Sequence, residues 1–98
     1  MVYIFRKKAV ALRYDQKKEN APKVVAKGSG KVAEKIIEIA KSHGIFIYED
    51  KELVEILSAL DIQQEIPPHL YQVIAEILAF VYRIGKKYTQ EQEIFTLK

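Results

Sequence analysis

The chain has 98 residues, of which 49% are hydrophobic and 30% charged, a balance typical of one small folded domain. Cysteine is absent, which excludes disulfide frameworks, thiolate metal sites and thiol catalysis. The net charge is only +3, the longest apolar run covers residues 77–82, and no secretory signal is visible, so we expect a cytoplasmic protein without a membrane span.

The first half of the chain predicts two strands followed by a helix. Alternating apolar residues over 9–15 favour a strand, and a solvated connection over 16–22 leads to a second strand over 23–27. From Ser29 the apolar residues recur at helical spacing, and Gly44 is placed to end that helix with a left-handed residue.

The second half predicts another strand and two helices. The continuous apolar run over 45–50 is typical of a central strand buried on both faces. Asp50 is expected to cap a helix that ends around Asp61. A last helix begins at Pro67 and Pro68, and it is apolar almost all round, so we expect it to be largely covered.

This order of elements indicates an α/β fold. We expect a small mixed β-sheet of about four strands, surrounded by helices in a single compact domain over 1–98. The folded core is assigned to 9–84, and the polar segment 85–98, with its small apolar end, is treated as a C-terminal tail.

The segment VVAKGSGKVAEK joins the second strand to the first helix. It is a candidate phosphate-binding site, because a glycine turn before a helix can bind anions. A Walker-type loop is excluded because Lys31 is followed by Val32, and the dinucleotide motif lacks its third glycine. We interpret Gly28 and Gly30 as turn residues, with Ser29 as the helix cap. A phosphate or sulfate bound there would revive a nucleotide enzyme as an alternative.

Other candidates for catalysis or metal binding are weak. His43 and His69 are separated by a strand and a helix, and adjacent Glu49 and Asp50 point to opposite faces of a strand. The serines have no histidine at a recognisable spacing. We therefore expect no enzyme activity, no metal, no cofactor and no small-molecule substrate.

Several segments in order resemble the cytoplasmic C-terminal domain of the FlhB/YscU family, the substrate-specificity switch of flagellar and virulence type III secretion. They are AVALRYD, NAPKVVAKG, VAEKIIEIAKSHGIFIYED and LVEILSALDIQQEIPPHLYQVIAEILAFVYR, within residues 9–84. The resemblance implies a small mixed sheet with helices around it. It also implies a role in protein export, with export substrates and export-gate membrane proteins as partners.

The family's self-cleavage motif, Asn-Pro-Thr-His, precedes the AVAL strand. The matching positions here are Ile4, Phe5, Arg6 and Lys7, so the asparagine, the proline and the histidine are missing. The resemblance therefore implies a chain that does not cleave itself. Because the family's membrane part is also missing, we expect a free-standing version of the post-cleavage fragment.

The resemblance also implies a docking patch for export substrates. In the family an Ala-Pro pair before the second strand and an alanine and a leucine on the last long helix form this patch. The matching residues are Ala21, Pro22, Ala75 and Leu78, and we expect them to lie together at the surface. The alternative is that Ala75 and Leu78 are ordinary core residues.

A small basic nucleic-acid-binding domain is the leading alternative function. The isoelectric point of about 9.1 and the basic run at 6–8, with Arg13 and Tyr14 nearby, favour it. The charge distribution argues against nucleic-acid binding, because the lysines alternate with glutamates along the predicted helices instead of forming one stripe.

The first residues of the chain suggest a further strand. Val2, Tyr3, Ile4 and Phe5 are strong strand formers, so we expect them to pair with the sheet in their own domain or in a second copy. The chain would accordingly be a monomer or an edge-paired dimer.

Overall fold

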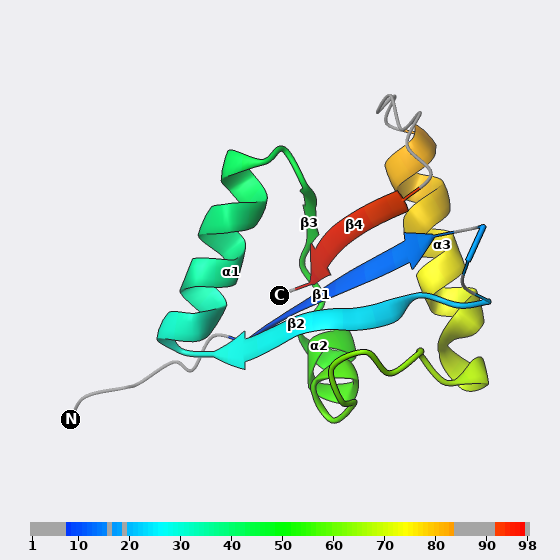
Figure 1. The fold of residues 1–98 in the computed structure, drawn as a ribbon, viewed down its shortest axis with the longest axis horizontal. Coiled ribbons are helices and arrows are strands. Elements are labelled where there is room, and N and C mark those ends of the chain that lie inside the picture. The colour runs from blue at the N-terminus through cyan, green and yellow to red at the C-terminus, as the bar shows by residue number, and fades with distance from the viewer. Residues whose placement is uncertain (1–7, 16, 19, 84–91, 98) are drawn as a thin grey trace.

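The computed structural model describes residues 8–15, 17–18, 20–83 and 92–97. They form a mixed sheet with helices on both faces (Figure 1), which confirms the predicted fold class. The strands are β1 (Lys8–Asp15), β2 (Lys23–Ser29), β3 (Phe46–Tyr48) and β4 (Gln92–Leu97). The helices are α1 (Lys31–Ser42), α2 (Lys51–Ser58), a 3-10 turn η1 (Pro68–Leu70) and α3 (Tyr71–Arg83).

The sheet has the order β2-β1-β4-β3. Strand β1 is antiparallel to both β2 and β4, whereas β3 and β4 are parallel. The prediction of a central strand over 45–50 is therefore wrong, since β3 is a short, half-buried edge strand. The reason is β4, which comes from the segment treated as a tail and lies between β1 and β3. The folded part thus extends beyond residue 84.

The alternation of side chains along β1 divides the core between the two faces of the sheet. Ala9 packs with Ala33 and Ile37 of α1, and the two alanines let the helix approach the sheet closely. Larger residues on the opposite face meet α2, α3 and the connection between them. That cluster comprises Val10, Leu12, Ala21, Val24, Leu53, Val54, Leu57, Ile66, Leu70, Ile74 and Ile77.

The helix ends confirm some of the expected signals and correct others. The carboxylate of Asp50 accepts a hydrogen bond of 3.1 Å from the Leu53 backbone N–H, as an N-cap should. Gly44, which follows the C-cap His43 of α1, has φ 67°, as expected of a left-handed residue there. Ser29, however, is the last residue of β2, and the N-cap of α1 is Gly30, which makes no side-chain hydrogen bond. Gly28 has no positive φ and instead lies under the side chain of Val32.

Helix α3 is covered on one side only. Ile74 and Ile77 of α3 face the core, as does Leu70 of η1 before it, whereas Tyr71 is 44% exposed and Phe80 is 46% exposed. The prediction of a largely covered helix is therefore wrong. The helix packs on one face of the sheet near its margin (Figure 1), and within the described ranges no further element covers its outer side.

Two sets of predictions lie outside the described residues. These are the strand pairing of residues 2–5 and the place of Ile4, Phe5, Arg6 and Lys7 before β1. Among the helices that are described, none is long and apolar enough to cross a membrane.

Candidate functional site: an apolar pocket between the start of β2 and α3

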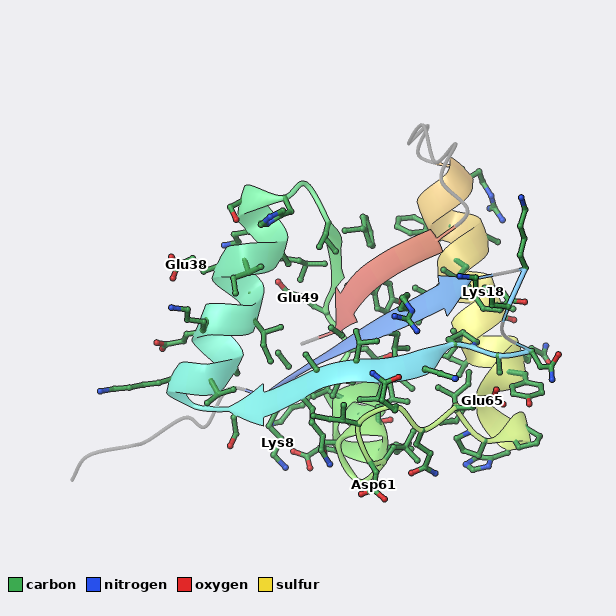
Figure 2. All side chains as sticks on the ribbon, viewed as in Figure 1. Lys8, Lys18, Glu38, Glu49, Asp61 and Glu65 are labelled. Carbon is green, nitrogen blue, oxygen red and sulfur yellow. The ribbon has the colours of Figure 1, made fainter. Side chains whose placement is uncertain are left out.

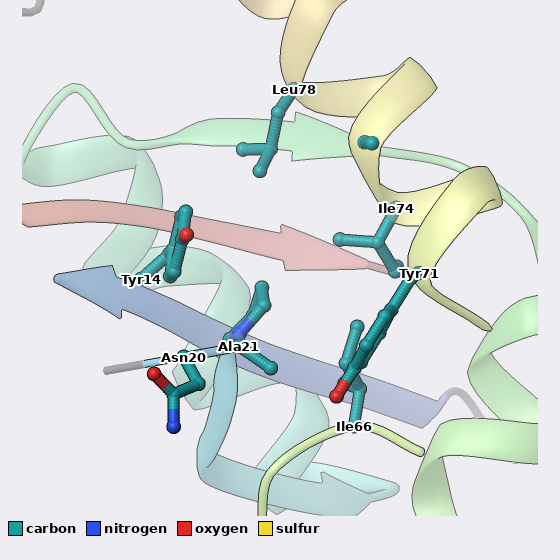
Figure 3. Close-up of a pocket in the computed structure, with 9 residues that line it drawn as sticks. Tyr14, Asn20, Ala21, Ile66, Tyr71, Ile74 and Leu78 are labelled. Carbon is teal, nitrogen blue, oxygen red and sulfur yellow. The ribbon is translucent and has the colours of Figure 1, made fainter. Parts of the chain in front are cut away.

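An open pocket of about 220 Å³ lies where the chain enters β2 beside α3 (Figure 3). It brings together all four residues of the expected docking patch, which come from two segments far apart in the sequence. We call it the docking pocket. Its lining residues are Tyr14, Asn20, Ala21, Pro22, Ile66, Tyr71, Ile74, Ala75 and Leu78.

The loop side of the docking pocket is held by backbone hydrogen bonds. The Ile66 N–H donates to the carbonyl of Pro22 at 2.9 Å, and the Val24 N–H donates to the carbonyl of Gln64 at 3.0 Å. Proline fixes φ at Pro22, so this wall loses little conformational entropy when it forms. The connection before η1 therefore fixes the loop that carries Ala21.

The helical repeat of α3 determines which of its residues line the docking pocket. Tyr71, Ala75 and Leu78 stand four and three residues apart and so share one face of the helix. Ile74 lies beside them and is buried in the core. Alanine at the middle position leaves room between the two larger side chains, so the helix presents a recess there.

The four predicted residues differ in burial. Ala21 and Pro22 are buried and form the floor, Leu78 is half-buried, and Ala75 is exposed. The expectation that all four lie at the surface is therefore wrong for the loop pair, because the segment before β2 packs into the core. The alternative of two ordinary core residues is also wrong for Ala75, which is exposed.

Sequence reasoning missed the two tyrosines of the docking pocket. Tyr71 could have been found from its helical spacing to Ala75 and Leu78. Tyr14, at the end of β1, is brought to the site by the β1–β2 connection, and no sequence pattern signals it. Figure 3 shows the Tyr71 ring running down from α3 toward Ile66.

The docking pocket offers shape and apolar contact instead of acid–base chemistry. None of the described side chains that line it is charged, and its polar groups are the Asn20 amide and the two tyrosine hydroxyls. Within the described ranges no group of three His, Asp or Glu side chains could hold a metal ion. The arrangement can bind an apolar side chain and give it a few polar anchors.

The histidines are held apart by the fold. His43 follows α1, where its Nδ1 lies 3.0 Å from the Ile39 carbonyl oxygen, and His69 is exposed in η1. Each therefore stands at a helix end, as the sequence predicted, and they do not form a pair.

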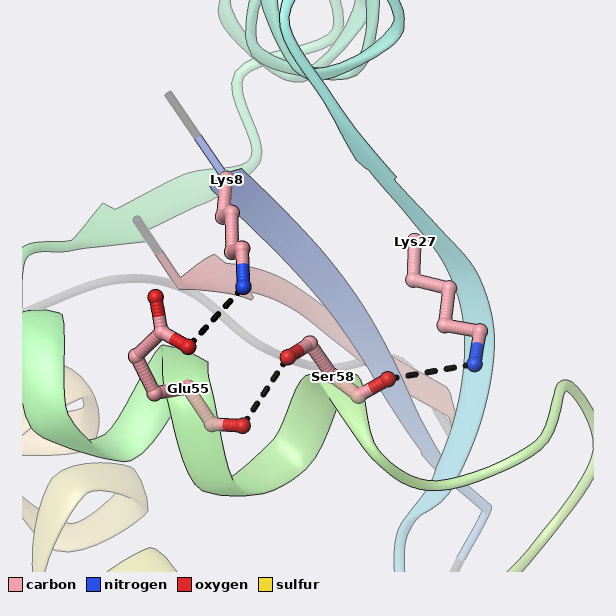
Figure 4. A network of polar contacts seen from close by, with 4 residues as sticks. All are labelled: Lys8, Lys27, Glu55 and Ser58. Atoms are coloured by element: carbon pink, nitrogen blue, oxygen red, sulfur yellow. Dashed lines mark hydrogen bonds and ion pairs between the residues drawn. The ribbon is translucent and has the colours of Figure 1, made fainter. Parts of the chain in front are cut away.

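Two lysines connect the sheet to α2 (Figure 4). Lys8 Nζ lies 2.9 Å from Glu55 Oε2 in an ion pair. Lys27 Nζ donates to the carbonyls of Ser58 at 3.1 Å and Leu60 at 2.6 Å. The second pair of contacts places a cation at the carboxyl end of α2, where it meets free carbonyls and the negative end of the helix dipole. Both amines therefore help to hold α2 against the sheet.

A second recess of about 280 Å³ lies between α3 and β3. Tyr48, Val73, Glu76, Ile77 and Phe80 line it. The Phe80 ring meets Phe46 edge to face, with centroids 6.1 Å apart. This contact attaches the exposed end of α3 to the edge of the sheet.

Known proteins that are similar to this chain indicate one family. The FlhB HrpN YscU SpaS Family matches residues 6–81. The uncharacterized protein YlqH of Bacillus subtilis (strain 168) is 47% identical over 80 residues, which is 82% of this chain and 86% of YlqH.

Longer relatives match over one part of their length. The flagellar biosynthetic protein FlhB of Aquifex aeolicus (strain VF5) is 44% identical over 80 residues, covering 81% of this chain but only 23% of that protein. Among solved structures, the crystal structure of the PscU C-terminal domain matches with a TM-score of 0.70 and 28% identity, over 76% of this chain and 95% of that one. The chain therefore belongs to the FlhB/YscU family of type III secretion and flagellar protein export, and it has the fold of that family's C-terminal domain.

Proposed function

We propose that this protein is a cytoplasmic export-switch domain that holds a short apolar segment of an export substrate, or of an export-gate protein, in the docking pocket. The observation that carries the proposal is the meeting of Ala21, Pro22, Ala75 and Leu78 around one recess. The family supplies the setting, protein export, and the pocket supplies the means of binding.

The size of the docking pocket supports a side chain as its ligand. Its volume of about 220 Å³ is below the ~300–1,000 Å³ of sites for drug-sized molecules. A leucine- or valine-sized side chain gains ~1.5–3 kcal/mol on full burial. One or two such groups give weak, reversible binding, which suits a protein that must release each export substrate.

The proposal includes the absence of self-cleavage. Cleavage in the family requires the Asn-Pro pair, and Ile4 and Phe5 stand at the matching positions. Neither side chain has a group that could attack a backbone carbonyl. We infer that the domain acts as an intact chain.

A matched pair of variants on α3 tests the docking function. Ala75 and Ala79 are both exposed alanines on the same helix, but only Ala75 lines the docking pocket. Ala75→Glu places a charge in the recess, whereas Ala79→Glu places the same charge one turn away, at the same cost in helix propensity.

Binding of a purified flagellar export substrate is measured by biolayer interferometry, and circular dichroism confirms that both variants fold. We expect Ala75→Glu to weaken binding about tenfold or more, because the glutamate must lose its hydration when the apolar segment docks. Ala79→Glu should bind like the unmodified protein. Equal binding by both variants, or no binding by the unmodified protein, would contradict the proposal.

A further inference from the structure

The second recess, between α3 and β3, combines three kinds of side chain. It has two aliphatic residues, two aromatic rings and one carboxylate, from Val73, Ile77, Tyr48, Phe80 and Glu76. Val73, Glu76 and Phe80 stand three and four residues apart, so they form a different face of α3 from the residues that line the docking pocket. The docking pocket has no charge on its described lining, so the two sites suit ligands of different chemistry.

Aromatic surface is held in place in the second recess and remains accessible. Phe46 meets the Phe80 ring edge to face, which attaches that ring to the edge of the sheet. Phe80 is nevertheless 46% exposed, and Tyr48 is half-buried against the main core cluster. Ile77 is buried and Val73 is half-buried, so these two residues form the inner wall. A ligand that enters the recess therefore meets aliphatic and aromatic surface together.

The Glu76 carboxylate has no neutralising partner within the described part of the chain. Glu76 is exposed, and its side chain forms no ion pair or hydrogen bond with a described residue. The next basic residue of α3 is Arg83, seven positions further on, which is ~10 Å along the helix axis. The carboxylate therefore gives the second recess a negative charge that a ligand can neutralise.

An arginine side chain matches all three features of the second recess. Its aliphatic stem packs on apolar surface, and its guanidinium is planar, weakly hydrated and able to stack on aromatic rings. The guanidinium also donates strong hydrogen bonds to carboxylates. Lysine is a poorer match because its compact ammonium is strongly hydrated. A purely apolar side chain would cover the Glu76 carboxylate without pairing it, and an acidic one would be repelled.

We propose that the second recess binds an arginine side chain presented by a partner protein. The aliphatic stem of the arginine packs on Val73 and Ile77. Its guanidinium lies against the rings of Tyr48 and Phe80 and pairs with the Glu76 carboxylate. The volume of about 280 Å³ suits one long side chain and is below that of sites for drug-sized molecules. The domain thereby gains a second protein contact, separate from the docking pocket and selective for charge.

The probe is the tripeptide acetyl-Ala-Arg-Ala-amide, and its twin carries citrulline, which has nearly the shape of arginine but no charge. Each peptide is titrated into the ¹⁵N-labelled protein, and backbone amide shifts are followed by NMR. We expect saturable shifts at Tyr48 and over residues 73–80 with the arginine peptide, and weaker binding as salt rises. The citrulline twin should bind at least about fivefold more weakly, because it forms neither the ion pair nor the cation–π contact.

Two pairs of variants locate the contact, and the amide spectrum of each variant reports whether it is folded. Glu76→Gln should bind the arginine peptide no better than the unmodified protein binds the citrulline twin. Glu38→Gln removes the same charge on the outer side of α1, where Glu38 points away from the sheet (Figure 2), and should leave binding unchanged. Phe80→Leu should weaken binding, whereas Phe80→Tyr keeps an aromatic ring and should bind normally.

Four results would overturn the proposal. These are no saturable binding of the arginine peptide, equal binding of the citrulline twin, shifts centred on Ala21 and Ala75 instead, and equal losses from Glu76→Gln and Glu38→Gln. A dimer of the protein alone in sedimentation that Glu76→Gln abolishes would also overturn it, because an arginine of a second copy would then fill the second recess. Every readout is independent of binding in the docking pocket.

Discussion

Gly28 lies where α1 passes closest to β2, and the structure leaves no room there for a methyl group. A Cβ at this position would lie 2.1 Å from Cγ1 and 2.7 Å from Cβ of Val32. Valine has one strongly preferred rotamer in a helix, so relief requires the helix to move. We expect Gly28→Ala to lower the free energy of unfolding by about 1–3 kcal/mol, the usual cost of overpacking. Without this contact, replacing a glycine in a strand with alanine would raise the free energy of unfolding by ~0.5–1 kcal/mol.

The contact between Gly28 and Val32 predicts that a second substitution, at Val32, restores some stability to Gly28→Ala. Val32→Ala alone should cost less than about 1 kcal/mol, because this side chain is 55% exposed and only part of its burial is lost. Combined with Gly28→Ala it removes the closer contact, at Cγ1, but leaves the Cβ of residue 32 at 2.7 Å, so the double variant should recover part of the stability that Gly28→Ala loses. A double-mutant cycle from urea denaturation followed by circular dichroism should give a coupling energy of about 1 kcal/mol or more.

Gly30 provides the control. A Cβ there would have no atom within 4 Å, but the residue has φ 61°, a conformation that favours glycine. Gly30→Ala should cost ~1 kcal/mol through backbone strain, and Val32→Ala should not restore the loss. The reasoning about Gly28 is refuted if Gly28→Ala is as stable as the unmodified protein, or if Val32→Ala leaves its stability no better.

Three further outcomes are expected. Asp50→Ala should lower the free energy of unfolding by ~1 kcal/mol, because the Leu53 N–H loses its cap, and no change in thermal denaturation would show that the 3.1 Å contact contributes nothing. Deleting residues 92–98 should abolish cooperative unfolding, because β1 and β3 lose the strand between them, and a cooperative transition for the shortened chain would contradict that role for β4. Prolonged incubation should leave one species near 11.3 kDa by mass spectrometry, whereas fragments from cleavage between residues 4 and 5 would show that cleavage persists.

Local features of this fold could be predicted because each depends on neighbouring residues. The helical spacing of α1 and α2, the Asp50 cap and the left-handed Gly44 all follow from contacts within a few positions. The prediction that Ser29 caps α1 was wrong, although it used the same local reasoning. A serine before a helix is a good cap in general, but here β2 continues through it, and Gly30 makes the turn.

The order of the strands could not be predicted, because it depends on pairings between distant segments. Nothing in the apolar run of β3 shows that Gln92–Leu97 will lie between it and β1. The edge position of β3 and the exposed side of α3 both depend on which elements cover them, and a sequence pattern records only how apolar a segment is.

The docking pocket was predicted in part. The resemblance supplied Ala21, Pro22, Ala75 and Leu78, and the structure brings all four to one recess. Their unequal burial and the place of Tyr14 depend on how the β1–β2 connection packs against α3. That arrangement is tertiary, so no spacing rule reveals it.

The central claim is that the docking pocket serves protein export, and complementation in cells tests it most directly. In cells whose FlhB lacks its C-terminal domain, the unmodified chain and Ala79→Glu should restore the switch in export specificity, measured as the change in secreted proteins. Ala75→Glu, expressed at the same level, should fail to restore it. Restoration by Ala75→Glu, or no restoration by the unmodified chain, would contradict the account.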